Sequence, residues 1–127
     1  MLRSLAAALC ASLMLWLSAW AEWPAWDFTQ ILLKAEQRYG NLGNAKTRLL
    51  AWNELMQTST GLGETEKLKL VNSFFNRQFR FSDDSRNWRQ TDYWATPVEA
   101  LIKGAGDCED FAIAKYFTLR RLGVPSE

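Results

Sequence analysis

Residues 106–125 read GDCEDFAIAKYFTLRRLGVP, and this stretch contains a helix start, an apolar helix body and a helix end. Asp107 suits the capping position, because its carboxylate can accept hydrogen bonds from the free N–H groups of the first turn. The body from 111 to 119 is apolar on nearly every face, apart from one lysine and one threonine. A helix of this kind is typical of a protein interior. Glycine and proline within 122–125 end it, so we predict a central helix whose first residue is Cys108.

Three amphipathic helices are predicted before this stretch. The first begins at a capping-box-like Asp27 and ends at Gly40; the second runs from about Asn44 to the turn-rich 58–63 segment; the third covers about 64–77. The residues expected to face the core are Phe28, Ile31, Leu32, Ala35 and Tyr39 in the first helix, Ala45, Leu49, Trp52 and Met56 in the second, and Leu68, Val71, Phe74 and Phe75 in the third.

The segment between the third helix and the central helix changes character. Phe79 and Phe81 alternate with polar residues, which favours a short extended piece. The sequence TPVE at 96–99 predicts a helix start with a capping box, and Gly104 ends that helix. A polar loop with aromatic residues lies between the two, and it either covers a core edge or forms the wall of a substrate groove. Its notable residues are Asp83, Asp84, Trp88, Asp92, Tyr93 and Trp94.

The N-terminus predicts export. Arg3 precedes an apolar run over 5–17, followed by Ala-Trp-Ala at 19–21, a small-x-small cleavage pattern. We therefore expect a signal peptide at 1–21 and a soluble exported chain at 22–127 that forms part of one domain. The whole sequence has 15 basic and 14 acidic residues, and the leader contains Arg3 but no acid, which leaves 14 of each. A neutral chain without a basic stripe predicts no nucleic-acid partner.

Cys108 is the one cysteine outside the predicted leader, in a compartment where thiols usually pair. At the first position of a helix, free N–H groups and the helix dipole favour a thiolate, which a nucleophile requires. The neighbouring carboxylates of Asp107, Glu109 and Asp110 oppose it, so an imidazolium or a bound hard cation would have to offset them. The alternative is purely structural: Asp107 caps the helix, and Cys108 is a small buried hydrophobe.

The segment WATPVEALIKGAGDCEDFAIAKYFTLRRLGVP at 94–125 closely resembles the bacterial transglutaminase-like cysteine proteinases, the periplasmic LapG-type proteases. The resemblance is good from the third helix onwards and loose over the first two. It implies an α+β fold with a papain/transglutaminase-like core, of which this chain is the mainly α-helical N-terminal half, lacking the β-sheet. It also implies that Cys108 is the nucleophile of a Cys-His-Asp triad and that Asp107 and Glu109 bind an activating calcium ion.

The family resemblance further implies a substrate and a partner. The substrate is the N-terminal region of a large surface adhesin, whose cleavage disperses the biofilm, and the partner is an inner-membrane cyclic-di-GMP receptor that sequesters the protease. An indole N–H from Trp88 or Trp94 is a candidate second oxyanion donor beside the Cys108 N–H. The sequence departs from the family pattern because it contains no histidine. An inactive truncated homologue, a non-catalytic calcium- or peptide-binding module and an amine acyltransferase are therefore alternatives.

Overall fold

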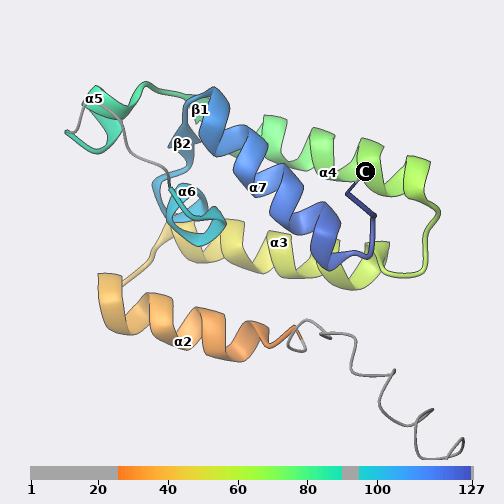
Figure 1. The fold of residues 1–127 in the computed structure, drawn as a ribbon. Coiled ribbons are helices and arrows are strands. Elements are labelled where there is room, and N and C mark those ends of the chain that lie inside the picture. Colours follow the sequence, from red (N-terminus) through yellow and green to blue (C-terminus); the bar gives the residue numbers. More distant parts are fainter. Residues whose placement is uncertain (1–25, 90–94, 127) are drawn as a thin grey trace, which may run out of the picture.

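The computed structural model describes residues 26–89 and 95–126, and these residues form a mainly helical structure (Figure 1). Three long helices, α2 (Phe28–Tyr39), α3 (Asn44–Ser59) and α4 (Glu64–Gln78), precede the short α5 (Asp84–Asn87) and α6 (Pro97–Lys103). The last helix, α7 (Cys108–Arg121), packs against α4 and α6, and α3 packs against α4 and α6 as well. No helix in the described ranges has both the length and the apolar character needed to span a membrane.

Two sets of predictions lie outside these ranges. The expected signal peptide at 1–21 precedes the first described residue, and Asp92, Tyr93 and Trp94 of the aromatic loop fall in the gap at 90–94.

A small parallel sheet connects the end of α4 to the start of α7. Strand β1 (Arg80–Phe81) pairs with β2 (Ala105–Gly106), with Arg80 opposite Ala105 and Phe81 opposite Gly106. This confirms the short extended piece expected after the third helix. It is the only sheet in the described part of the chain, so the prediction of a mainly helical half of an α+β fold is confirmed with this one addition. Because β2 runs directly into α7, its pairing fixes the backbone just before Cys108.

The core is built around Trp52, whose side chain is 1% exposed. Its indole N–H donates to the Thr118 hydroxyl (3.0 Å), and that hydroxyl donates to the Ala114 carbonyl (2.8 Å). The polar atoms of both buried side chains are thereby satisfied at the interface of α3 and α7. The other large core side chains are Leu49, Met56, Val71, Phe74, Phe75, Phe79 and Leu101.

The predicted ends of α6 and α7 are confirmed. Thr96 and Glu99 form the capping box at the start of α6, and Gly104 ends that helix in the left-handed conformation (φ +66°). At the end of α7, Gly123 has φ +86°, its N–H donates to the Arg120 carbonyl, and the next N–H donates to the Leu119 carbonyl. These two bonds form a Schellman motif, which needs a residue that tolerates positive φ.

The prediction that Leu68 faces the core is wrong, because its side chain is 43% exposed. The buried stripe of α4 continues from Val71 to Lys67, one turn earlier, and not to Leu68. Lys67 lies over the end of α7 and its ammonium donates to the Leu122 carbonyl (2.8 Å). Tyr39, also expected to face inward, is 39% exposed at the last position of α2.

Two other expectations need adjustment. Helix α3 runs two residues into the expected turn, to Ser59, and the Thr58 hydroxyl bonds back to the Glu54 carbonyl (2.9 Å), as threonine can within a helix. Helix α7 is not enclosed on every face, because Tyr116 is 59% exposed. Neighbouring helices cover one side of α7, which carries the buried residues Asp110, Ala114 and Thr118, and leave the opposite side open.

Candidate active site

Cys108 is the first residue of α7, as predicted, and its thiol is free and exposed. The structure therefore excludes the alternative in which Cys108 is a small buried hydrophobe. An exposed thiol at a helix start can contact a second molecule, while the rest of the helix is held in the core. This combination of a fixed backbone and an accessible sulfur suits a nucleophile.

A reciprocal capping box holds the backbone on both sides of the cysteine. The Asp110 N–H donates to the Asp107 carboxylate (3.2 Å), and the Asp107 N–H donates to the Asp110 carboxylate (3.1 Å). The N–H groups of Cys108 and Glu109, which lie between them, have no hydrogen-bond partner among the described residues. These two donors at the positive end of the helix dipole are available to an incoming anion or carbonyl oxygen.

Asp110 also ties α7 to the segment that enters α6. It is 1% exposed, and its second oxygen accepts from the Ala95 N–H at 3.1 Å. Gly106 makes this arrangement possible, because a Cβ at that position would lie 2.6 Å from the Asp110 Cβ and 2.9 Å from its Oδ2. The glycine in the Gly-Asp-Cys-Glu-Asp sequence is therefore required by close packing.

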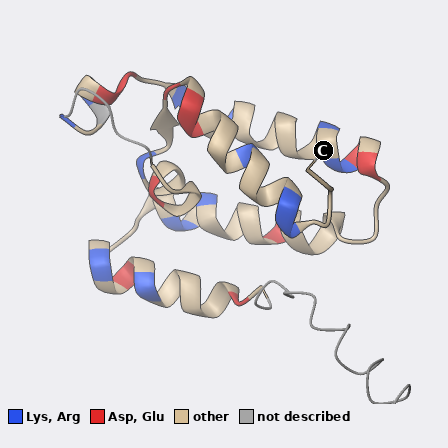
Figure 2. Ribbon diagram, in the orientation of Figure 1, with Lys and Arg blue, Asp and Glu red and all other residues tan. Residues whose placement is uncertain are grey.

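Three carboxylates gather beside the start of α7. One oxygen each from Asp84, Asp107 and Asp110 lies within 4.8 Å of the others, and Figure 2 shows acidic residues (red) on α5 and at the start of α7. Burial raises the pKa of Asp110, and the charges of Asp107 and Asp84 add to this effect, against the lowering effect of its two backbone hydrogen bonds. A cation at this position would relieve the repulsion.

The donor set fits a hard cation. Calcium binds carboxylate oxygens at about 2.3–2.6 Å, so oxygens on opposite sides of the ion are about 4.6–5.2 Å apart, close to the observed spacing. Of the two predicted metal ligands, Asp107 belongs to this cluster, whereas Glu109 is an exposed first-turn residue that does not form part of it. The sequence predicts neither Asp84, on α5, nor Asp110 as a metal ligand, although it does place the Asp110 carboxylate close to the sulfur.

The predicted indole donors are placed only in part. Trp88 follows α5 and is half-buried, with the Lys103 ammonium 5.0 Å from its ring centroid. Trp94 lies outside the described residues. A second oxyanion donor from either indole stays a prediction.

Comparison with known proteins agrees with this geometry. The sequence model of the family described as bacterial transglutaminase-like cysteine proteinases matches residues 43–127, which include Cys108 and all three clustered carboxylates. The chain belongs to this family. A comparison with curated protein sequences gave no match.

Solved structures of LapG from Legionella pneumophila are similar to this chain. A calcium-bound form is 42% identical, with a TM-score of 0.61, and covers 76% of this chain and 52% of its own. A second LapG structure is 40% identical, with a TM-score of 0.63, and the match covers 80% of this chain and 53% of the LapG chain. An EGTA-treated form is also 40% identical, with a TM-score of 0.63, and the match covers 82% of this chain and 54% of the LapG chain. The chain thus spans about half the length of these relatives.

Proposed function

We propose that this chain supplies the nucleophile of a cysteine endopeptidase, with Cys108 attacking the scissile carbonyl. The observation that carries the proposal is the exposed thiol on a backbone locked by the Asp107–Asp110 capping box, beside two N–H groups available to an oxyanion. Attack would form a tetrahedral intermediate whose oxygen accepts from the Cys108 N–H, and departure of the amine would leave a thioester for water to hydrolyse.

Complete turnover needs an imidazole as general base and then general acid. The 127 residues contain no histidine, so the activity requires a group that they do not provide. A second candidate function is a non-catalytic calcium- or peptide-binding module, because the clustered carboxylates could hold an ion without any chemistry at Cys108. Transfer of the acyl group to an amine, the third alternative, would use the same thioester and differ only in the acceptor.

We propose calcium as the cofactor, on the strength of the calcium-bound LapG relative and the fit of the clustered carboxylates. Asp107, with Asp84 and Asp110 from the cluster and Glu109 from the family resemblance, would hold the ion. The ion would neutralise negative charge that otherwise disfavours a thiolate at Cys108. Asp107 has a double role in this proposal, because it also caps the nucleophile's helix.

Terbium, a luminescent substitute for calcium, can identify the ligands by titration of the full chain. Asp107→Asn should weaken binding by at least about tenfold. If the geometric cluster is the site, Asp84→Asn should weaken it comparably while Glu109→Gln changes little. The reverse ranking would favour the pair predicted from the sequence. Equal binding in all three variants would contradict a calcium site here.

We further propose, from the family resemblance, that the protein acts in the periplasm on the N-terminal region of a large surface adhesin, whose release disperses the biofilm. An inner-membrane receptor for cyclic-di-GMP would sequester it. Placing Cys108→Ser at the gene's own locus tests the activity, because adhesin should then stay on the cell surface. Cys10→Ser is the matched control, since it changes the other cysteine and should release adhesin normally. Normal release by the Cys108→Ser strain would contradict the endopeptidase.

A further inference from the structure

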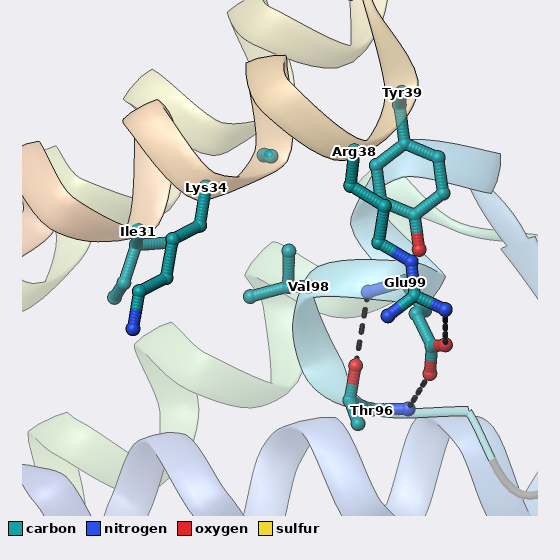
Figure 3. Close-up of a pocket in the computed structure, with 8 residues that line it drawn as sticks. Ile31, Lys34, Arg38, Tyr39, Thr96, Val98 and Glu99 are labelled. Atoms are coloured by element: carbon teal, nitrogen blue, oxygen red, sulfur yellow. Dashed lines mark hydrogen bonds and ion pairs between the residues drawn. The ribbon is translucent and has the colours of Figure 1, made fainter.

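A long groove runs between α2 and α6, away from Cys108. Its middle is a hollow of about 250 Å3 (Figure 3). It shares Tyr39 and Glu99 with a neighbouring hollow of about 290 Å3, and Ile31, Thr96 and Val98 with another of about 630 Å3 that reaches α7. Because the middle hollow shares lining residues with a hollow on each side, the groove suits an extended chain better than a compact small molecule.

The groove has an apolar floor and a cationic rim. Ile31 and Ala35 on α2 and Val98 on α6 form the floor of the middle hollow. Lys34 and Arg38, one helical turn apart on α2, form its rim, and in Figure 3 both extend from α2 beside this floor. A hollow with an apolar floor can hold apolar side chains, and the basic rim favours acidic groups beside them.

Some of the charged side chains that line the groove have partners within the described residues, and others do not. The one acid, Glu99, uses one oxygen to accept from the Thr96 N–H (2.8 Å) and the other to pair with Arg38 (4.0 Å). Lys34 has no hydrogen bond or ion pair to any described residue. At the far end, Lys103 lines the adjoining hollow. The surplus is positive, so a ligand with carboxylates would complement it.

The groove does not include the nucleophile or its carboxylates, although Trp88, one of the two candidate indole donors, lines the hollow at one end. One wall is α2, which precedes the region matched by the family model, residues 43–127. The other wall is α6, within that region. Cys108 and the clustered carboxylates do not line any of the three hollows. Helix α2 packs against α3 and lies at the margin of the helices in Figure 1.

We propose that the α2–α6 groove binds an extended segment of a partner protein in which apolar side chains alternate with Asp or Glu. The apolar side chains would enter the hollows over Ile31, Ala35 and Val98, and the carboxylates would pair with Lys34 and Arg38. The apolar contacts would provide affinity, and the basic residues would add specificity. It does not depend on the chemistry at Cys108.

Fluorescence anisotropy of a short labelled peptide of alternating Leu and Asp, added to the full chain, tests this. We expect saturable binding that weakens as salt is raised and that is lost when Lys replaces Asp in the peptide. Lys34→Glu should weaken binding by about tenfold, and Val98→Asp by more, because it places a charge on the floor. Lys69→Glu on α4 is the matched control for net charge and should change affinity by less than about twofold.

Several results would overturn the proposal. They are absence of saturable binding, equal weakening by Lys34→Glu and Lys69→Glu, and tight binding of the Lys-containing peptide. Concentration-dependent dimerisation of the chain that Val98→Asp abolishes would show that a second copy occupies the groove instead. Cys108→Ser should bind the peptide normally, so failure of the groove and failure of the endopeptidase are distinguishable.

Discussion

Replacing Gly106 by alanine tests the packing that positions Cys108. The added Cβ would lie 2.6 Å from the Asp110 Cβ and 2.9 Å from its Oδ2, and Asp110 is buried, so something must shift. Overpacking costs about 1–3 kcal/mol, and weakening the charge-assisted hydrogen bonds that the Asp110 carboxylate accepts from the Ala95 and Asp107 N–H groups adds about 1.5–3 kcal/mol. Because alanine lowers the conformational entropy of the unfolded chain, it offsets about 0.4–1 kcal/mol of this loss in the free energy of unfolding. We expect a net loss of about 1.5–5.5 kcal/mol.

Urea unfolding followed by far-ultraviolet circular dichroism measures this loss. Gly61→Ala is the matched control, because a Cβ there meets nothing within 4 Å and its φ is not positive. It should change the free energy of unfolding by less than about 0.5 kcal/mol.

A double-mutant cycle identifies the cause of the loss. If the clash with Asp110 is responsible, Gly106→Ala should cost much less in an Asp110→Ala background, with a coupling energy of about 1–3 kcal/mol. Additive costs of the two substitutions would refute this explanation. A neutral Gly106→Ala would refute the close packing itself, and with it the claim that Asp110 fixes the backbone at Cys108.

Three further predictions concern stability and are measured by urea unfolding. Arg48→Met should cost about 2–3 kcal/mol, because the guanidinium donates to two carbonyls at the end of α6 (2.6 and 2.7 Å). Arg48→Lys should recover only part of this stability, and full recovery would contradict a contact that needs two guanidinium nitrogens. Thr118→Val should cost about 1–3 kcal/mol by leaving the buried Trp52 indole N–H without its acceptor, whereas the exposed Tyr116→Phe should be nearly neutral; equal effects would argue against the buried bond. Because burial raises the pKa of Asp110, the folded chain keeps this proton at pH values where the unfolded chain releases it. The part of the stability that depends on this proton is therefore lost as pH rises from about 4 through the raised pKa of the folded chain. Asp110→Asn should remove that part of the pH dependence, and an unchanged pH dependence would contradict the assignment.

The local features of the fold could be predicted because their causes lie within a few residues. The Thr96 capping box, the left-handed Gly104 and the end of α7 at Gly123 each depend on contacts three to five residues apart. Such contacts follow from side-chain chemistry at fixed spacing. Helical periodicity likewise placed Trp52 and Val71 in the core.

Contacts between distant residues escaped prediction. The two hydrogen bonds from Arg48 to the end of α6 span sequence separations of 53 and 54 residues. The short distance between Asp84 and Asp107 depends on how β1 and β2 pair. No spacing rule reports such contacts. Asp110 did carry a signal, since it lies four residues before Ala114 on the buried stripe of α7. A carboxylate at a buried position must be satisfied, and that requirement points to backbone donors or a cation.

Stability and chemistry are separated at the start of α7. Asp110 and Gly106 are buried and fix the backbone through close packing and hydrogen bonds, while Cys108 is exposed. Changing the sulfur should therefore leave folding almost untouched, whereas changing its buried neighbours should affect folding and reactivity together. The same separation extends to the α2–α6 groove, whose lining does not include the nucleophile. Cys108 contributes little to folding, yet its backbone is strongly constrained. We expect a chemical function at such a residue.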